Sequence, residues 1–265
     1  MQEAWLGGYW DEMSTFMRSL MNSTFKTNPA LGRGLITGVT HVVRESFFSD
    51  LNNLEIVTAS SPKYQTSFGF TEDEVFAALD EYGLGTDRKG VRDWYDGFTF
   101  DGVSNIYNPW SITKFLDSGG IYDAYWANTS GNGLVSSLLR RGGRRFKQDF
   151  EELLAGGTVS KVIDEQVVFS ELYTRPNAVW ALLLAAGYVK AHGPTPKNLV
   201  ETPRELAITN REVLLTFGRM VEGWFAVADD SYDDFTQAIL GGDARTATKA
   251  LADVTVSCIS SFDSG

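Results

Sequence analysis

Two threonines and an arginine lie at and just after an apolar run, and their side chains are of the kinds that contact phosphate. The run GLITGV at residues 34–39 has the pattern of a short strand covered on both faces. Thr37 lies within the run, and Thr40 and Arg44 follow it. Hydroxyl and guanidinium groups both donate hydrogen bonds to phosphate oxygens. A purely structural alternative stays open, in which Thr40 caps the next helix and Arg44 pairs on the surface with an acid such as Glu45 or Asp50.

A second candidate for phosphate contact is the segment RRGGRRFK at residues 140–147. It has five cations and no acid, whereas residues 66–139 have 11 acids and 4 bases. The alternative is a solvated helix end, because two arginines before a Gly-Gly pair are favourable at a helix C-terminus. The candidate nucleic-acid or phosphate contacts are Arg140, Arg141, Arg144, Arg145 and Lys147.

The sequence has none of the familiar patterns for nucleotide, metal or nucleophilic chemistry. No window fits the phosphate loop Gly-x-x-x-x-Gly-Lys-Ser/Thr, and GLGTDRKG at 83–90 has the wrong spacing. Asp164-Glu165 follows only two apolar residues, which favours a strand that begins after a turn over a magnesium-binding carboxylate. Nucleophile-elbow and zinc-protease motifs are absent. We therefore assign no catalytic residue and no metal ligand.

Composition indicates a folded protein that is not targeted to a membrane. The 265 residues are 43% hydrophobic and 22% charged, with a net charge of −11. The longest apolar stretch, residues 178–189, is too short to cross a bilayer, and the N-terminus lacks a signal-peptide pattern. A single cysteine and two distant histidines exclude an internal disulfide and a zinc cluster. We expect a cytoplasmic protein.

The periodicity predicts a mainly α fold with small β elements, in the α+β class. A helix is expected within residues 1–30, and TEDEVFAALDEYGLG opens with the capping box Thr71–Glu74. Residues 98–107 alternate around Asp101-Gly102 as a β-hairpin, and Asn108-Pro109 begins another helix. Residues 150–215 follow the order of a winged helix, and 216–265 are helical and end in a helical hairpin.

Six segments in order resemble one known family. ITGVTHVVRESFFSDLNNLEIV, FGFTEDEV, VRDWYDGF, IYNPWSI, YWANTSGN and VWALLLAAGYV are similar to the AAA-ATPase-like proteins that commonly precede a PD-(D/E)XK nuclease-like domain. The resemblance covers residues 1 to about 260. It implies a remnant of a P-loop α/β core at 1–65, a helical lid with a hairpin at 66–149, a winged-helix-like region at 150–215 and a helical linker at 216–265.

The resemblance also implies that this sequence is an internal fragment. In the family, a phosphate loop and an acidic strand motif precede the part similar to MQEAWLGGYWDEM, and a nuclease-like domain follows the part similar to the end of this chain. ATP and Mg²⁺ are thus expected cofactors of a longer protein, with the nuclease-like domain as a partner. No cofactor is expected for this chain alone, and alone it is expected to be inactive.

The resemblance gives the first cluster a role as a nucleotide sensor. It places Thr37 and Thr40 at the end of the strand beside the magnesium-binding one, and Arg44 where the family has a lysine. The family has an arginine where this chain has His41, which weakens any guanidinium role at that position. The alternative function is non-enzymatic: a module that binds a protein or nucleic acid through the winged-helix-like region and residues 140–147.

Overall fold

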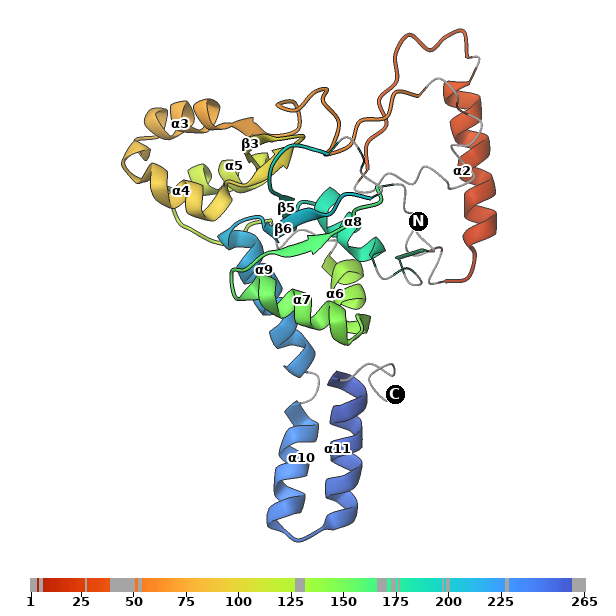
Figure 1. Cartoon of the computed structure of the whole chain (residues 1–265), viewed down its shortest axis with the longest axis vertical. Coiled ribbons are helices and arrows are strands. Elements are labelled where there is room, and N and C mark those ends of the chain that lie inside the picture. Colours follow the sequence, from red (N-terminus) through yellow and green to blue (C-terminus); the bar gives the residue numbers. More distant parts are fainter. Residues whose placement is uncertain are drawn as a thin grey trace. The chain divides into compact units, whose positions relative to one another are not determined.

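The computed structural model is mainly α-helical with small β-sheets, which confirms the predicted class (Figure 1). It describes residues 4, 7–26, 28–38, 51, 54–126, 132–165, 171–172, 175, 177–196, 198, 201–226 and 229–258; for 132, 222–226, 229–234 and 253–258 only the backbone is described. The chain forms two compact units. Unit 1 comprises Met1–Phe68, Phe98–Ser104 and Ser160–Leu206, and unit 2 comprises Gly69–Gly97, Asn105–Val159 and Ala207–Gly265.

Unit 1 contains one long helix and most of a small sheet. Three strands form a sheet in the order β4-β6-β5. The helix α8 precedes β5, and residues 192–203 separate β5 from β6. The elements are α2 (Trp10–Phe25), β2 (Phe98–Phe100), β4 (Val159–Lys161), α8 (Ala178–Ala185), β5 (Val189–Ala191) and β6 (Arg204–Ile208).

Unit 2 is built almost entirely of helices. Strand β1 pairs antiparallel with β3, with Phe70 opposite Tyr107 and Thr71 opposite Ile106. The elements are β1 (Phe70–Thr71), α3 (Glu72–Glu81), η1 (Gly85–Asp87), α4 (Arg88–Tyr95), β3 (Val103–Tyr107), α5 (Pro109–Asp117), α6 (Asn132–Arg141), α7 (Arg144–Leu154), α9 (Arg211–Ala226), α10 (Asp229–Leu240) and α11 (Ala244–Cys258).

Side-chain caps fix where several helices begin, as the sequence predicts. Thr71 and Glu74 form the reciprocal capping box at the start of α3. The Asn108 side chain accepts a hydrogen bond from the backbone N–H of Trp110, with Pro109 at the first helical position of α5. Each cap satisfies backbone N–H groups that the helix itself leaves without partners.

The predicted β-hairpin is confirmed between β2 and β3. Asp101 has φ of 45° and Gly102 has φ of 85°, so both turn residues adopt the left-handed conformation that matches the strand twist. The Asp-Gly pair is well suited to this turn, because glycine has no Cβ to clash and aspartate tolerates positive φ.

The core of unit 2 is aromatic and joins α3, α4, α5 and β3. The ring of Tyr95 is fully buried, and its centroid lies 5.6 Å from that of Phe115. Tyr122 packs against both rings, with centroids at 6.1 and 4.8 Å. Large aromatic side chains contribute strongly to burial, so this cluster accounts for the compactness of the unit. Its fully buried members are Val75, Leu79, Val91, Tyr95, Tyr107, Ile112 and Phe115.

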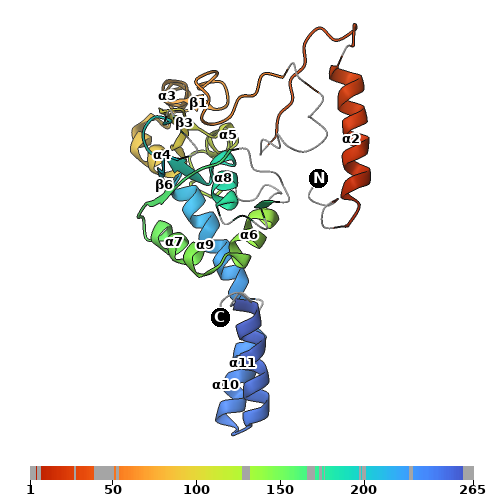
Figure 2. The ribbon, with the colours of Figure 1, turned by 45° about the vertical axis from the view of Figure 1, so that its right-hand side comes forward.

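Helices α10 and α11 form the predicted helical hairpin and lie side by side in both views (Figures 1 and 2). Asp243 begins α11 by accepting hydrogen bonds from the backbone N–H of Arg245 and Thr246, both at 3.1 Å, and from the Thr246 hydroxyl at 2.6 Å. Small buried side chains at Ala238 and Ala247 allow the two helices to approach closely.

Helix α8 is buried on all sides. Each side chain from 178 to 184 is buried, so the helix has no solvent-facing stripe. Its sequence is accordingly apolar throughout, which is typical of a central helix and not of a surface helix. Among the described residues, no helix is both long and apolar enough to cross a membrane.

The strand predicted at 34–39 is not formed by the described residues 34–38. These residues have no regular secondary structure, and all of them are exposed. Leu35 leaves 86% of its surface in contact with solvent. The prediction was wrong for this part of the chain because a strand needs a hydrogen-bonded neighbour, and residues 34–38 have none among the described strands.

Replacing Gly97 by alanine should destabilise the protein by roughly 2–4 kcal/mol, because two constraints act there at once. Gly97 has φ of 130°, and an added Cβ would lie 2.2 Å from the carbonyl oxygen of Thr209. Urea denaturation measures the loss. Gly133→Ala is the matched control, since Gly133 is helical with open space around it, and it should be neutral or stabilise by up to ~1 kcal/mol. If both substitutions changed the free energy of unfolding equally, the positive φ and the close approach of Thr209 at Gly97 would not be the cause of the loss.

Candidate functional site

Of the predicted phosphate-sensing residues, the structure describes Thr37 alone. Thr37 is exposed in the irregular segment 33–38. Thr40, His41 and Arg44 lie outside the described residues. The sensor role of this cluster therefore stays a prediction.

The basic segment lies at the junction of α6 and α7. Arg140 and Arg141 occupy the last turn of α6, as expected for a helix that ends at Gly142-Gly143. The next two arginines open α7, and all four arginines are exposed, whereas Lys147 is half-buried. Both helices belong to unit 2, so the five cations share one corner of the same unit.

A polar cluster in unit 1 joins three distant parts of the sequence. The Thr58 hydroxyl donates a hydrogen bond to Glu165 Oε2 at 2.6 Å, and the Ser60 hydroxyl donates to Glu165 Oε1. Arg204 at the start of β6 donates from Nη1 to Ser60 Oγ at 2.9 Å. The Ser60 hydroxyl thus bridges a guanidinium and a carboxylate, and the loop at 58–61 is tied to both.

Arg204 is a buried cation with few partners. Only 6% of its surface is exposed, and burial lowers the pKa of its guanidinium, while the charges of Glu165 and Asp101 act in the opposite direction. Its buried Nε atom has no hydrogen-bond partner in the part of the chain that the structure describes. A buried arginine normally uses several of its five donors, so the bond to Ser60, its one side-chain hydrogen bond among the described residues, carries much of its compensation.

Both acids of the Asp164-Glu165 pair have protein partners. Asp164 forms an ion pair with Arg175 at 3.3 Å, and Glu165 accepts the two hydroxyl hydrogen bonds. Within the part of the chain that the structure describes, no group of three or more histidine, cysteine, aspartate or glutamate side chains could hold a metal ion.

Unit 2 has its own buried charge at the start of α9. Glu212 is 2% exposed and reaches two other segments. Its Oε2 accepts the Ser111 hydroxyl of α5 at 2.8 Å, and its Oε1 accepts the backbone N–H of Trp126 at 2.6 Å. Burial raises the pKa of Glu212 and the charge of Asp123 adds to the rise, although the two hydrogen bonds oppose it.

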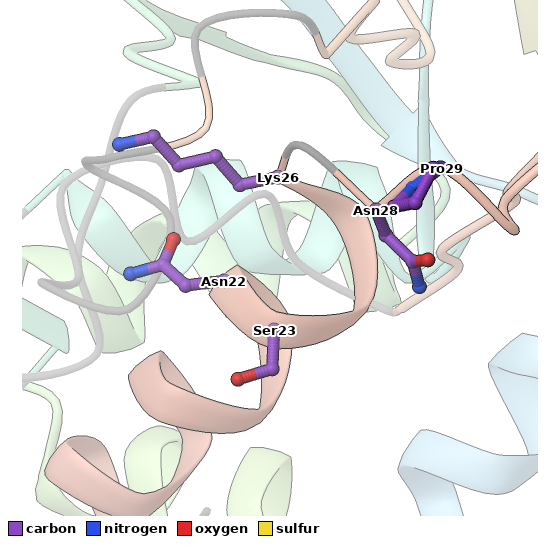
Figure 3. Close-up of a pocket in the computed structure, with 5 residues that line it drawn as sticks. All are labelled: Asn22, Ser23, Lys26, Asn28 and Pro29. Atoms are coloured by element: carbon purple, nitrogen blue, oxygen red, sulfur yellow. The ribbon is translucent and has the colours of Figure 1, made fainter.

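A hollow near the end of α2 is polar and wide open (Figure 3). Asn22 and Lys26 extend to the same side, one helical turn apart. Asn28 is already engaged, because its Nδ2 donates to the carbonyl of Thr24 at 3.2 Å. With no enclosing wall, this hollow offers little to a small ligand. Its lining residues are Asn22, Ser23, Lys26, Asn28 and Pro29.

Comparison with known proteins gives one distant similarity. The chain is 25% identical over 210 residues to a protein of Azotobacter chroococcum mcd 1 described as an uncharacterized protein in the vnfD 5' region. The match covers 77% of this chain and 38% of that protein, so the chain spans about two fifths of its relative's length. No family model matches the chain. No solved structure matches it either.

Sequence patterns did not indicate the two buried charges. Glu212 lies in the first turn of a helix, where an acid is common for reasons of the helix dipole alone. Arg204 begins a short strand as an ordinary polar residue would. Their partners are 101 and 144 residues away in the sequence, and covariation between homologues would be the signal that could find such pairs.

Replacing Ser60 by alanine should reduce the free energy of unfolding by about 1–3 kcal/mol, because it removes the hydroxyl between Arg204 and Glu165. Ser67→Ala is the matched control: Ser67 is exposed and donates a hydrogen bond from its backbone N–H, which alanine keeps, so the change should be within about 0.5 kcal/mol. Urea denaturation of both variants measures the two changes in the free energy of unfolding. If Ser60→Ala is as stable as Ser67→Ala, Arg204 does not depend on this hydroxyl.

Replacing Glu212 by glutamine should flatten part of the pH dependence of stability. Because the pKa of Glu212 is raised in the folded chain, stability is lost as pH rises from its ordinary value of about 4.5 through the raised value. Glutamine cannot ionise, but its side-chain carbonyl can accept from the Trp126 N–H. Its amide N–H can donate to the Ser111 hydroxyl oxygen, which in the native chain donates to Glu212 instead. The variant should therefore gain stability relative to the native chain across that window, measured by urea denaturation at a series of pH values.

The control for this experiment is Glu212→Ala. It leaves the Trp126 N–H and the Ser111 hydroxyl without their acceptor and should cost about 2–3 kcal/mol throughout the range. A glutamine variant that follows the native chain at every pH would show that Glu212 titrates normally.

Proposed function

We propose that this chain is the sensor-and-lid portion of a P-loop ATPase of the AAA-ATPase-like kind, and that it does not bind or hydrolyse ATP by itself. The phosphate loop and the acidic strand motif would come from sequence outside these 265 residues. The observation that carries the proposal is the exposed apolar segment at 34–38.

An exposed segment of this composition is unusual in a protein that folds alone. Leu35 and Ile36 are both exposed, at 86% and 36%, in a run that has the pattern of a doubly covered strand. Water contact with these side chains is unfavourable, and none of the described strands pairs with this backbone. A core strand separated from the rest of its sheet would have these properties.

The aromatic core of unit 2 supports the assignment of a lid. Its fully buried residues come from α3, α4, β3 and α5, all within residues 75–115. A lid has to move as a body while remaining folded, and a locally closed core of this kind meets that requirement. The coverage of the Azotobacter protein, 38% of its length, is consistent with a longer complete protein.

We derive no catalytic step for this chain. Of the proposed sensing set, Thr37 alone is described, and it is exposed. In the complete protein we assign Thr37, Thr40 and Arg44 to contacts near the γ-phosphate, where charge spreads over the phosphoryl oxygens during transfer. ATP and Mg²⁺ would be cofactors of that protein, a nuclease-like domain its further part, and the cytoplasm its compartment.

Calorimetric titration with Mg-ATP tests the proposal. The chain as it stands should give no binding heat, whereas a form extended upstream to restore the phosphate loop and acidic motif should bind. In the extended form, Thr40→Ala and Arg44→Ala should lower kcat by on the order of tenfold to a thousandfold, in line with the removal of a group that stabilises transition-state charge. Tight binding of ATP by the short chain would refute the proposal.

A further inference from the structure

The junction of α6 and α7, residues 140–147, is a concentrated cationic surface, here called the arginine corner. It has five cations and no acid in a chain whose net charge is −11. Its four arginines are exposed, two at the end of α6 and two at the start of α7, on either side of Gly142-Gly143. The rest of the chain is therefore strongly acidic, and the corner is where a polyanion would meet least repulsion.

Arg144 and Arg145 are placed where they do not stabilise their own helix. They occupy the first turn of α7, at the positive end of the helix dipole, where acids are favourable and cations are not. Gly143 precedes them and supplies no side-chain cap. Neither arginine has an ion-pair partner among the residues that the structure describes, unlike Arg88 and Arg92 of the same unit, which pair with carboxylates.

We propose that the arginine corner binds the phosphate backbone of nucleic acid, with Arg144 and Arg145 as its principal contacts. A guanidinium matches a phosphate group with two parallel hydrogen bonds, and a nucleic-acid strand presents phosphates at short, regular intervals, so several cations of the corner are engaged at once. This binding is independent of the proposed ATPase role, and neither depends on the other being correct.

The binding is independent of base sequence. In a winged-helix arrangement, α8 is the helix that would enter a groove, but all its side chains from 178 to 184 are buried. It therefore presents nothing to base edges, which are what direct readout requires. The arginine corner supplies contacts to phosphate alone, and such contacts carry affinity and salt dependence without sequence information.

Fluorescence anisotropy of a labelled oligothymidylate of about 20 nucleotides, titrated with the full chain, tests the proposal. The double variant R144Q/R145Q should bind more weakly, on the order of tenfold at low salt. Its plot of log K against log salt between about 50 and 200 mM should be flatter by about 0.7 for each phosphate that the variant no longer neutralises. An oligonucleotide of mixed sequence should give the same result.

The matched control is R245Q/K249Q. Arg245 and Lys249 are exposed on α11 in the same unit, and removing them changes the net charge equally. This control should leave both affinity and salt slope within about twofold of the native values. Unchanged thermal unfolding by circular dichroism verifies that all variants remain folded.

Three outcomes would overturn the proposal. One is no binding of the native chain to the oligonucleotide at low salt. Another is an equal weakening in the R144Q/R145Q variant and the R245Q/K249Q control, which would mean that net charge alone matters. The third is binding of equal strength, with the same dependence on Arg144 and Arg145, to polyglutamate or phosphatidylserine vesicles, which would make the corner a general polyanion surface.

Discussion

The buried carboxylate of Glu212 is the contact on which the arrangement of unit 2 depends most. One side chain at the start of α9 receives a hydroxyl from α5 and a backbone N–H from the segment that leads to α6. An apolar side chain at this position would leave both donors buried without an acceptor. The aromatic core excludes water beside this contact, and in a medium of low dielectric each hydrogen bond to the charge is strengthened. The packing of the aromatic core thus strengthens the hydrogen bonds of Glu212.

Unit 1 also contains a buried charged side chain, but this one is a cation. Arg204 is buried and donates a hydrogen bond to the Ser60 hydroxyl, which in turn donates one to Glu165. In both units a serine hydroxyl forms a hydrogen bond with the buried ion, and among the described residues neither ion has a direct ion pair. A hydroxyl can rotate to donate or accept, which lets it compensate a charge without the rigid geometry of a salt bridge. The two units still differ, since Arg204 retains an unbonded Nε whereas both oxygens of Glu212 have partners.

Much of the helical framework could be predicted from the sequence because it depends on contacts between nearby residues. The contacts between residues distant in the sequence could not be predicted. The caps at Thr71 and Asn108 and the Asp101-Gly102 turn each involve residues within a few positions of one another, so short patterns identify them. The strand predicted at 34–39 failed for the described residues 34–38 because pairing is a property of two segments, and hydropathy describes only one of them. The Glu212 and Arg204 contacts were missed because their partners are far apart in the sequence. The arginine corner was visible in the sequence as a run of cations, but its division between a favourable and an unfavourable helix end required the structure.

The hairpin of α10 and α11 differs from the rest of unit 2 in the chain entropy that its formation must overcome. The hydrogen bonds of its turn at Gly241-Gly242 and of the cap at Asp243 join residues at most five positions apart. The two helices that then pack together are neighbours in the sequence. The Glu212 contacts instead close loops of 86 and 101 residues. Loop closure becomes more costly with length, and topologies with short-range contacts fold faster. The hairpin can therefore fold early and independently. The centre of unit 2 can fold only after distant segments of the chain have come into contact.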